Sequence, residues 1–256
     1  MINSLGRGLR VLTMLAEANG PLGVTELAVR LNVDPSSSYR LLATLEQQGF
    51  VRQEPHGKKY ALGYAVLGVA AAVLRKLDVA VAAAPHLRAL AASTGESTHL
   101  AVLDGANAVF IGREIAAAVL RVDTTIGSSE PAHCTAVGKA LVADLDRAEL
   151  ARRFGDGPFT SFTARTITTL EELTADLLRC RAQGHARDDE EMHIGVRCLA
   201  APIQGHLGNT VAALGLSGPA GRLTHERLPE LATAVAEAAG EVSLAMGFVQ
   251  RQALRA

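Results

Sequence analysis

The first fifty residues contain three short helical patterns separated by turn residues. Residues 4–18 have apolar side chains at spacings of three and four, which predicts an amphipathic helix with an inward stripe of Leu5, Leu9, Leu12 and Ala16. Residues 25–31 predict a second helix. Residues 36–48 predict a third, which follows Asp34 and Pro35, a typical N-cap and first helical residue. We therefore expect three short helices at this end of the chain.

A strand-like pattern follows the third helix. Residues 50–53 and 58–62 flank a turn at 54–57, which predicts a two-stranded hairpin with Lys58 and Lys59 beside its tip. Three short helices followed by a hairpin is the element order of a winged helix-turn-helix. Residues 1–63 are therefore predicted to form a DNA-binding domain.

The start of the third helix has the residue types that read DNA. Recognition helices present side chains to base edges from this position, and here the chain has Ser36, Ser37, Ser38, Tyr39 and Arg40. Hydroxyl groups can bond phosphates or bases, and a guanidinium can bind guanine with two hydrogen bonds. There is an alternative for each group that involves no DNA. The serines after Asp34 and Pro35 could serve only to cap the helix start, and Lys58 and Lys59 could simply be solvated surface residues. The hairpin favours contact with DNA.

The remainder of the chain predicts a linking helix and an α+β domain. Residues 64–75 are rich in Ala, Leu and Val and predict a helix buried on most sides, so we assign residues 64–78 to linking and dimerisation. Residues 79–256 are assigned to one further domain on an antiparallel sheet. Its expected strands are residues 97–103, 108–113, 118–123, 196–203 and 210–216, and its expected helices are residues 78–93, 134–145, 170–183 and 228–248, the last with Thr224 as N-cap.

Composition agrees with two domains of unequal size and charge. The chain has 256 residues, 48% of them hydrophobic and 20% charged, which suits a globular protein. A net charge of -1 by itself argues against a nucleic-acid binder. However, residues 1–60 contain seven basic and five acidic residues, which leaves a net charge of -3 on the rest. The basic end is therefore the predicted DNA-binding end.

The cysteines and the apolar stretches bear on the cellular compartment of the protein. Cys134, Cys180 and Cys198 cannot all pair, which favours a reducing environment. Neither a signal peptide nor a stretch suited to crossing a membrane is evident. We expect a soluble cytoplasmic protein with no membrane partner, no metal and no cofactor.

Two motifs in the second domain have residues that suit ligand binding. In residues 127–140 a loop rich in small residues enters a helix, whose first amide groups near Thr135 and Val137 lack partners within the helix and suit an anion. In residues 188–198 four acidic residues in a row precede Cys198. Each motif alone is weak, because every helix has an amino terminus and an acidic run is often a solvated turn.

Together these segments resemble the IclR family of bacterial transcriptional regulators. The resemblance covers Gly127 to Ala140 and Asp188 to Ile203, followed by the Leu-Gly-Leu-Ser-Gly-Pro run of residues 214–219. At the other end, residues 25–28, 40–46, 49–51 and 60–63 resemble the winged helix of the family. The match runs in order from about residue 4 to residue 248.

The resemblance implies a repressor or an activator, of which we favour the repressor, that acts as a homodimer or a dimer of dimers on a palindromic operator. It also implies a GAF-like effector domain that binds a small metabolite, often a carboxylic acid. The DNA-binding residues would be Thr25, Ser36, Ser37, Ser38, Tyr39, Arg40, Lys58 and Lys59. The effector-binding residues would be Ala136 and Val137, through their amides, with Asp188, Cys198 and Ser217.

Two departures from the family pattern affect these sites. Gly215 stands where some members have a second serine, two residues before Ser217, so one hydroxyl for the ligand is missing. Pro35 stands where many members have a lysine, just before the serines of the recognition helix. The first departure concerns the identity of the ligand and the second concerns the pattern of DNA contacts.

The pocket chemistry can also be argued from the residue types. Amides, a hydroxyl and a thiol are neutral donors that together satisfy the acceptor lone pairs of a carboxylate. An ionised Asp188 beside that anion costs Coulomb energy unless one of the two takes a proton. Binding is therefore predicted to tighten modestly as the pH falls.

Three other functions fit parts of the sequence. An enzyme could use Cys198, or Cys134 beside His133, as a thiol nucleophile. A metal site could draw on His133, Asp188, His193 and Cys198, although their spacing matches no compact motif. The amino-terminal helices could also dock a protein instead of DNA. The remaining candidates, His99, His185, His206 and Cys180, are interpreted as ordinary strand, turn or core residues.

Overall fold

A computed structural model describes residues 3–18, 20–55, 57–74 and 79–249. The chain divides into two compact units, Met1–Lys76 and Leu77–Ala256, and each is described by itself. Residues 75–78, which belong to the predicted linking segment, lie outside the described residues.

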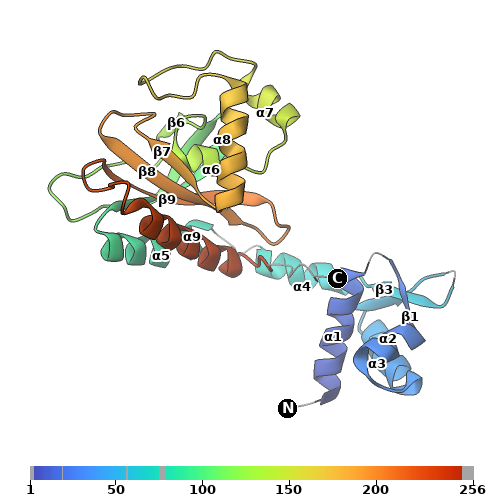
Figure 1. The fold of residues 1–256 in the computed structure, drawn as a ribbon. Coiled ribbons are helices and arrows are strands. Elements are labelled where there is room, and N and C mark those ends of the chain that lie inside the picture. Colours follow the sequence, from blue (N-terminus) through green and yellow to red (C-terminus); the bar gives the residue numbers. More distant parts are fainter. Residues whose placement is uncertain (1–2, 19, 56, 75–78, 250–256) are drawn as a thin grey trace. The chain divides into compact units, whose positions relative to one another are not determined.

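The amino-terminal unit is a winged helix-turn-helix, as predicted. Three helices pack with a small three-stranded antiparallel sheet, whose first strand lies between the first two helices, and a fourth helix follows the last strand (Figure 1). The elements are α1 (Asn3–Glu17), β1 (Leu22–Gly23), α2 (Val24–Leu31), α3 (Pro35–Gln47), β2 (Val51–Gln53), β3 (Lys59–Leu62) and α4 (Ala65–Leu74). The sequence pattern did not predict β1, which pairs with β3 through Leu22 and Tyr60.

The buried face of α1 differs from the prediction. Leu5 and Leu9 are 60% and 57% exposed, whereas Gly8, Val11 and Leu15 are buried with α2 and α3. The helix has apolar residues on two faces, and spacing alone could not distinguish the face that meets the other helices. Of the predicted stripe, Leu12 packs against this core as expected, whereas Leu5, Leu9 and Ala16 are exposed. Helix α1 therefore has a second, exposed apolar face.

The wing is joined closely to the end of α3. Gly49 has a positive φ of 74°, and its carbonyl oxygen would lie 2.1 Å from a Cβ placed on Gly63. Only glycine at residue 63 permits this approach, which starts α4 directly after β3. Helix α4 was expected to be buried on most sides, but within a single chain Tyr64, Leu67 and Val69 are exposed.

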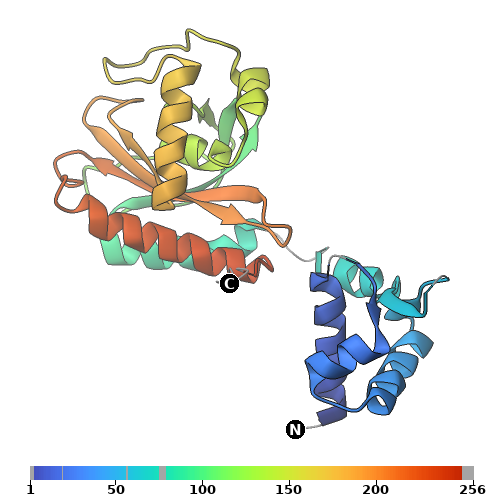
Figure 2. The ribbon, with the colours of Figure 1, turned by 45° about the vertical axis from the view of Figure 1, so that its right-hand side comes forward.

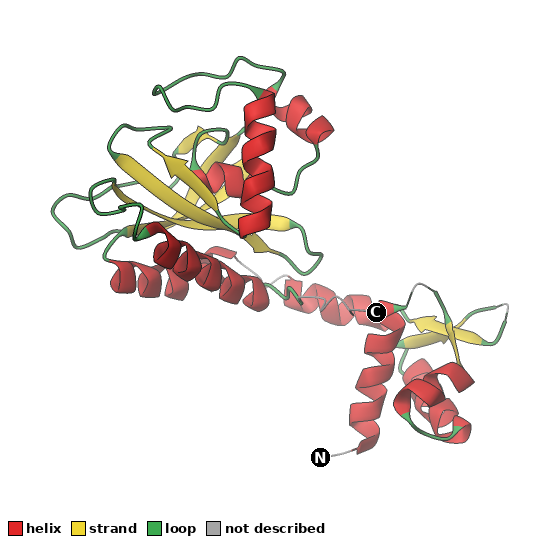
Figure 3. Cartoon of the chain, viewed as in Figure 1, coloured by secondary structure: helices red, strands yellow, loops and turns green. Residues whose placement is uncertain are grey.

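The carboxy-terminal unit is built on a six-stranded sheet with the order β6-β5-β4-β9-β8-β7, in which every neighbouring pair is antiparallel. This confirms the predicted α+β class with a central antiparallel sheet (Figure 3). The strands are β4 (Ser97–Asp104), β5 (Asn107–Glu114), β6 (Ser129–Pro131), β7 (Ala186–Asp189), β8 (Val196–Gln204) and β9 (Thr210–Pro219). The helices are α5 (Val79–Thr94), α6 (Ala136–Val142), α7 (Arg147–Phe154), α8 (Leu170–Gln183) and α9 (Leu228–Ala245).

Helices cover both faces of this sheet (Figure 2). On one face, α5 and α9 bury a core that includes Leu100, Leu199 and Leu214. On the other face, α6 and α8 bury a second core of smaller side chains, among them Ala101, Ala200 and Ala213. The cavity described below lies between α6 and this second face.

Several expected elements of this unit differ in the structure. Residues 118–123, predicted as a strand, form a loop, and the strand that pairs with the outer edge of β5 is β6. Strands β6 and β7 and helix α7 were not predicted. Arg227 rather than Thr224 is the N-cap of α9, and the backbone oxygen of Thr224 accepts from Leu228 N at 3.1 Å. Among the described residues no helix has the length and apolar character to cross a membrane.

Candidate functional site

The start of α3 is organised around Asp34. Its Oδ1 accepts hydrogen bonds from Ser37 N at 2.9 Å and from Ser36 Oγ at 2.5 Å, and its Oδ2 accepts from Ser37 Oγ at 2.7 Å. The bond from the Ser36 hydroxyl, with those from Ser37, holds the pKa of Asp34 well below its usual range. The helix-start chemistry considered for these serines is therefore present, and it fixes their side chains on one exposed surface.

The predicted DNA-binding residues divide into exposed and buried groups. Tyr39 and Arg40 are exposed on α3, and Thr25 is exposed at the start of α2. Arg40 Nη2 donates to Ser37 Oγ at 3.3 Å. Ser38 differs from the prediction, because its side chain is fully buried and donates to Val24 O at 3.1 Å. Ser38 therefore joins α3 to α2 and does not lie on the exposed surface.

Lys58 and Lys59 are exposed at the tip of the wing. Lys58 has a positive φ of 52°, a conformation of tight turns. Next to them on β2, Arg52 forms an ion pair with Glu54 at 2.9 Å and lies over the ring of Tyr64. The guanidinium of Arg52 therefore has partners within the unit, whereas the side chains of the two lysines are exposed to solvent.

The second predicted site is a closed cavity of about 30 Å³ between α6 and the sheet. It brings together all five predicted effector-binding residues: Ala136, Val137, Asp188, Cys198 and Ser217. The sequence prediction omitted the other lining residues, which are His99, Phe110, Val122, Thr124, Glu130, Thr135, Met192, His193 and Val196. A cavity of this size has room for about one or two water molecules, so a ligand must widen it.

Strand register assembles the polar wall of this cavity. Asp188 on β7 pairs with Cys198 on β8, which in turn pairs with Ser217 on β9. The three side chains form one row across the sheet, and Ser217 Oγ donates to Cys198 Sγ at 3.0 Å. Residues almost 30 positions apart in the sequence thus become neighbours through antiparallel pairing.

Helix α6 supplies the opposite wall. Thr135 is its N-cap and accepts from Gly138 N at 3.3 Å, so the amides of Ala136 and Val137 are those with no acceptor inside the helix. A Cβ at Gly138 would lie 2.2 Å from Ala132 Cα, which shows how tightly the loop turns into the helix. The motif in residues 127–140 is therefore a compact turn that brings Ala136 and Val137 to the cavity.

The titratable groups of the cavity are shifted by burial. Asp188 is 2% exposed, and burial raises its pKa to about 6 although its Oδ1 accepts from Glu191 N at 2.7 Å. Burial also raises the pKa of the Cys198 thiol, and it raises that of Cys134 to about 12. Both thiols are thus protonated at neutral pH, the opposite of an activated nucleophile. His133 bonds to Thr160 O at 3.1 Å and not to Cys134.

The sequence prediction did not single out Lys139. This residue follows the cavity amides on α6, is fully buried, and has its ammonium 2.7 Å from Glu191 Oε1 and 3.0 Å from Asp176 Oδ2. Burial alone would lower the pKa of Lys139, but the two carboxylates outweigh it and raise that pKa. The ion pairs connect α6, α8 and the acidic segment behind the cavity. The clue in the sequence was a single charged residue inside an otherwise apolar helix.

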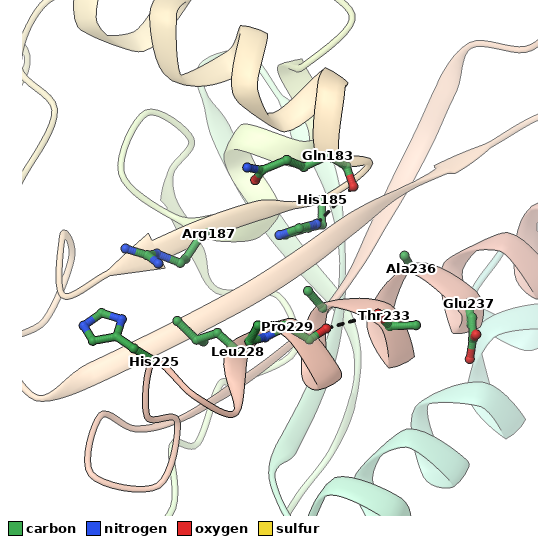
Figure 4. Close-up of a pocket in the computed structure, with 10 residues that line it drawn as sticks. Gln183, His185, Arg187, His225, Leu228, Pro229, Thr233, Ala236 and Glu237 are labelled. Carbon is green, nitrogen blue, oxygen red and sulfur yellow. Dashed lines mark hydrogen bonds between the residues drawn. The ribbon is translucent and has the colours of Figure 1, made fainter.

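Other candidate residues lie apart from the cavity. A groove of about 780 Å³ runs between the end of α8, the β7 edge and α9, and it includes His185, Arg187 and His225 (Figure 4). Cys180 is buried on α8, as expected for a core residue. No cluster of three metal-ligating side chains occurs in the part of the chain that the structure describes.

A winged helix-turn-helix and a separate α+β domain with a closed polar cavity define a class of protein: a DNA-binding regulator that responds to a small ligand. Comparison with known families identifies which one. The "IclR helix-turn-helix domain" matches residues 4–55, and the "Bacterial transcriptional regulator IclR C-terminal" domain matches residues 71–244. The chain belongs to the IclR family.

Individual relatives agree along nearly the whole chain. The chain is 35% identical over 248 residues to the Transcriptional repressor IclR of Escherichia coli (strain K12), covering 96% of this chain and 90% of that protein. It is 33% identical to the HTH-type transcriptional regulator XynR of the same organism, with 97% and 98% covered. Among solved structures, the Agobacterium tumefaciens repressor BlcR is similar with a TM-score of 0.78 at 26% identity, covering 97% of this chain and 99% of that one.

These findings establish the general function. The chain is a DNA-binding transcriptional regulator whose carboxy-terminal domain is a ligand-binding domain. The family and the relatives consist of regulators, so the thiol- or metal-dependent enzyme considered from the sequence is not supported.

Proposed function

We propose that this protein is a repressor whose operator binding is controlled by a small carboxylic acid held in the closed cavity. The observation that carries the proposal is the meeting of the α6 amides with Asp188, Cys198 and Ser217 around one cavity. Relatives named as repressors, including the Acetate operon repressor of Salmonella typhimurium, support the direction of control.

The cavity chemistry favours a carboxylate bound by neutral donors. The amides of Ala136 and Val137, the hydroxyl of Ser217 and the protonated thiol of Cys198 can all donate to carboxylate oxygens. Asp188 then meets the ligand either as a protonated acid or as an acceptor for a ligand hydroxyl. The small volume favours an acid of few carbons, with the segments that contain Val122 and Met192 moving to admit it.

The DNA contacts are proposed from the exposed surface of the amino-terminal unit. Thr25, Ser36, Ser37, Tyr39 and Arg40 would face the major groove or its phosphates, and Lys58 and Lys59 would meet the backbone from the wing. Ser38, predicted as a contact, is assigned instead to joining α2 and α3. The operator is proposed to be palindromic double-stranded DNA, and this partner implies a cytoplasmic protein.

A palindromic operator requires at least a homodimer, and a dimer of dimers is also compatible with it. The exposed apolar side chains of Leu5 and Leu9 on α1, and of Leu67 and Val69 on α4, suit coverage by a second copy. We keep residues 1–63 as the DNA-binding domain, residues 64–78 as the linking and dimerisation segment, and residues 79–256 as the effector domain.

The effector proposal is tested by thermal shift with straight-chain acids of two to six carbons, each paired with its methyl ester as a neutral control. At least one acid should raise Tm while its ester does not, because the donors of the cavity are matched to an anion. The same acid should then weaken binding to the protein's own upstream DNA in a mobility-shift assay. Equal shifts with acids and esters would contradict the carboxylate assignment.

The DNA proposal is tested on the same upstream DNA over a salt series. Affinity should fall steeply with salt, since phosphate contacts release counterions. An affinity independent of salt would favour the alternative in which the amino-terminal unit docks a protein.

A further inference from the structure

The hydrogen bonds between Asp34 and the first two serines of α3 have a fixed direction. Ser36 Oγ lies 2.5 Å from Asp34 Oδ1, and Ser37 Oγ lies 2.7 Å from Asp34 Oδ2. The bond from Ser36, with those from Ser37, holds the pKa of Asp34 well below its usual range, so the carboxyl group is ionised at physiological pH. An ionised carboxylate only accepts, and a hydroxyl has one proton. Each serine therefore donates that proton to Asp34.

Both serine oxygens are thus left with acceptor lone pairs only. Arg40 confirms this direction at Ser37, because its Nη2 donates to Ser37 Oγ at 3.3 Å and a guanidinium cannot accept. The bonds form one chain that runs from Arg40 through Ser37 to Asp34. Ser36 is exposed, and in the described part of the chain its Oγ has no hydrogen-bond partner besides Asp34. Ser36 therefore presents a free acceptor to the surroundings of α3.

The direction of these bonds limits what the serines can meet on DNA. Helix α3 is the second helix of the helix-turn-helix, which lies in the major groove. On the base edges there, the amino groups of adenine and cytosine are the donors, whereas the guanine and thymine edges offer acceptors. Phosphate oxygens are acceptors too. A hydroxyl that has given its proton to Asp34 can bond an amino group but has no proton left for a phosphate, and the exposed carboxylate beside it repels a phosphate.

We propose that Asp34 is a positioning residue for DNA recognition, which holds the Ser36 hydroxyl as an acceptor for the amino group of an adenine or a cytosine in each half-site. This inference rests on the proposed DNA contacts and narrows them, since Ser36 reads a base edge rather than a phosphate. Ser37 is half-buried and its oxygen accepts from Arg40, so its role is to orient the guanidinium. Arg40 is the donor of this surface, for the acceptors of guanine or of a phosphate.

Positioning can be separated from helix capping by the choice of variants. The cap itself is the bond from Ser37 N to Asp34 Oδ1 at 2.9 Å, and Asn and Gly are also favoured at this position of a helix. Asp34→Asn keeps the oxygen that receives the Ser36 proton. Asp34→Gly has no side-chain acceptor and frees that proton, and Ser36→Ala removes the hydroxyl. If Asp34→Gly has no cooperative thermal transition, Asp34→Ser takes its place, because its one oxygen is needed for the cap.

The test uses a duplex that the full chain selects from a random pool, so the operator need not be known. Each adenine of the selected duplex is replaced in turn by 2-aminopurine, and each cytosine by 2-pyrimidinone. Both analogues still pair with the opposite base but lack the amino group in the major groove. Duplexes with 7-deazapurines, which lack the N7 acceptor, are the matched controls. Dissociation constants are measured by fluorescence anisotropy at one salt concentration for the wild-type chain and the three variants.

At one position of each half-site, loss of the amino group should weaken wild-type binding about tenfold. Asp34→Asn should keep most of this ratio. Ser36→Ala should reduce the ratio to about one by binding the unmodified duplex less tightly. Asp34→Gly should also reduce it, but by binding the modified duplex more tightly than the wild-type chain does, since the freed hydroxyl can donate to the carbonyl of the opposite base. A capping role alone would lower both affinities together, and an unchanged ratio in Asp34→Gly would overturn the inference.

The remaining outcomes separate this inference from the proposed DNA contacts. If the position that responds to Ser36→Ala depends on a purine N7 and not on an amino group, Ser36 is a donor and the role of Asp34 is overturned while the contact stands. If Ser36→Ala leaves every ratio unchanged, Ser36 does not read a base, with the same consequence. Failure of the pool to converge on a common sequence would overturn the proposed operator binding and this inference with it.

Discussion

The two units of this protein use polar side chains in opposite ways. In the amino-terminal unit Ser36 and Ser37 of α3 donate to Asp34, and the exposed Arg40 donates to Ser37, on the surface of the helix start. In the carboxy-terminal unit Asp188, His99 and Lys139 are each at most 3% exposed and lie at or behind a closed cavity. A surface that binds a polyanion must stay accessible, whereas a site that selects one small molecule gains from excluding water.

The difference also determines how each unit responds to its surroundings. Exposed charges such as Lys58 and Lys59 are screened, so their contribution to DNA binding depends on salt. Buried groups are screened little and have shifted pKa values instead, as Asp188 and His99 do. The comparison therefore predicts salt sensitivity in one unit and pH sensitivity in the other.

The largest expected effect is on the stability of the carboxy-terminal unit. Lys139→Met leaves the carboxylates of Glu191 and Asp176 without their buried partner, which should lower the free energy of unfolding by about 3–5 kcal/mol. Lys59→Met removes the same charge from the exposed wing and should change stability by less than about 0.5 kcal/mol. Urea unfolding of both variants checks this, and similar losses would contradict the contrast between the units.

The next effect concerns DNA binding. Arg40→Ala should weaken operator binding about a hundredfold, because each half-site is deprived of an interaction worth about 1–3 kcal/mol, while dimerisation and the effector-induced thermal shift remain. Arg30→Ala is the matched control, since Arg30 is exposed but paired with Glu26 at 2.7 Å on α2. A loss of the dimer in Arg40→Ala would show that residue 40 belongs to an interface instead.

The opposite result is expected for Asp188→Ala. This variant should retain DNA binding and lose the response to the effector.

A third effect is the pH dependence of effector affinity. The pKa of Asp188 is about 6 in the free protein, and a bound anion raises it further, so binding takes up a proton above pH 6. Affinity should therefore increase as pH falls from 8 to 6, by at most about tenfold per unit, and level off below 6. Calorimetry at several pH values measures this slope. Asp188→Asn should flatten it, and a flat wild-type profile would count against a shared proton.

A smaller effect tests the corrected role of Ser38. Ser38→Ala removes a buried hydrogen bond to Val24 O and should cost about 1 kcal/mol of stability. Ser36→Ala, at the exposed end of the same run, should alter stability less and weaken DNA binding more. Thermal unfolding and mobility shifts on both variants would reveal the reverse pattern if Ser38 reached the DNA.

The smallest effect is expected at the wing. Lys58→Ala and Lys59→Ala should each weaken DNA binding only a few-fold, because each removes one ammonium group from the DNA backbone in every half-site. The slope of log affinity against log salt should become shallower by about one for each phosphate that the lysine neutralises. Mobility shifts of both variants over a salt series measure this slope, and an unchanged slope in both would mean that the wing does not touch phosphate.

The sequence was informative where structure is local. The caps and breakers of residues 32–49 correctly predicted α2 and α3, because Asp34, Pro35 and Gly49 act within one or two turns of the chain. The predicted strand at 118–123 failed because its alternation lacks a neighbouring strand to pair with, and most of the stripe of α1 failed because two apolar faces competed. Both errors concern partners that lie far away in the sequence.

The sequence by itself determined the family, the order of the elements and five residues of the cavity, since the motifs in residues 127–140, 188–203 and 214–219 are each contiguous. Only the tertiary structure decided which further residues join them. Strand pairing places His99 opposite Gly215, at the cavity. Lys139 forms a buried ion pair because α8 brings Asp176 next to it. Spacing along a chain reports the period of an element, whereas register and helix packing determine what each side chain meets.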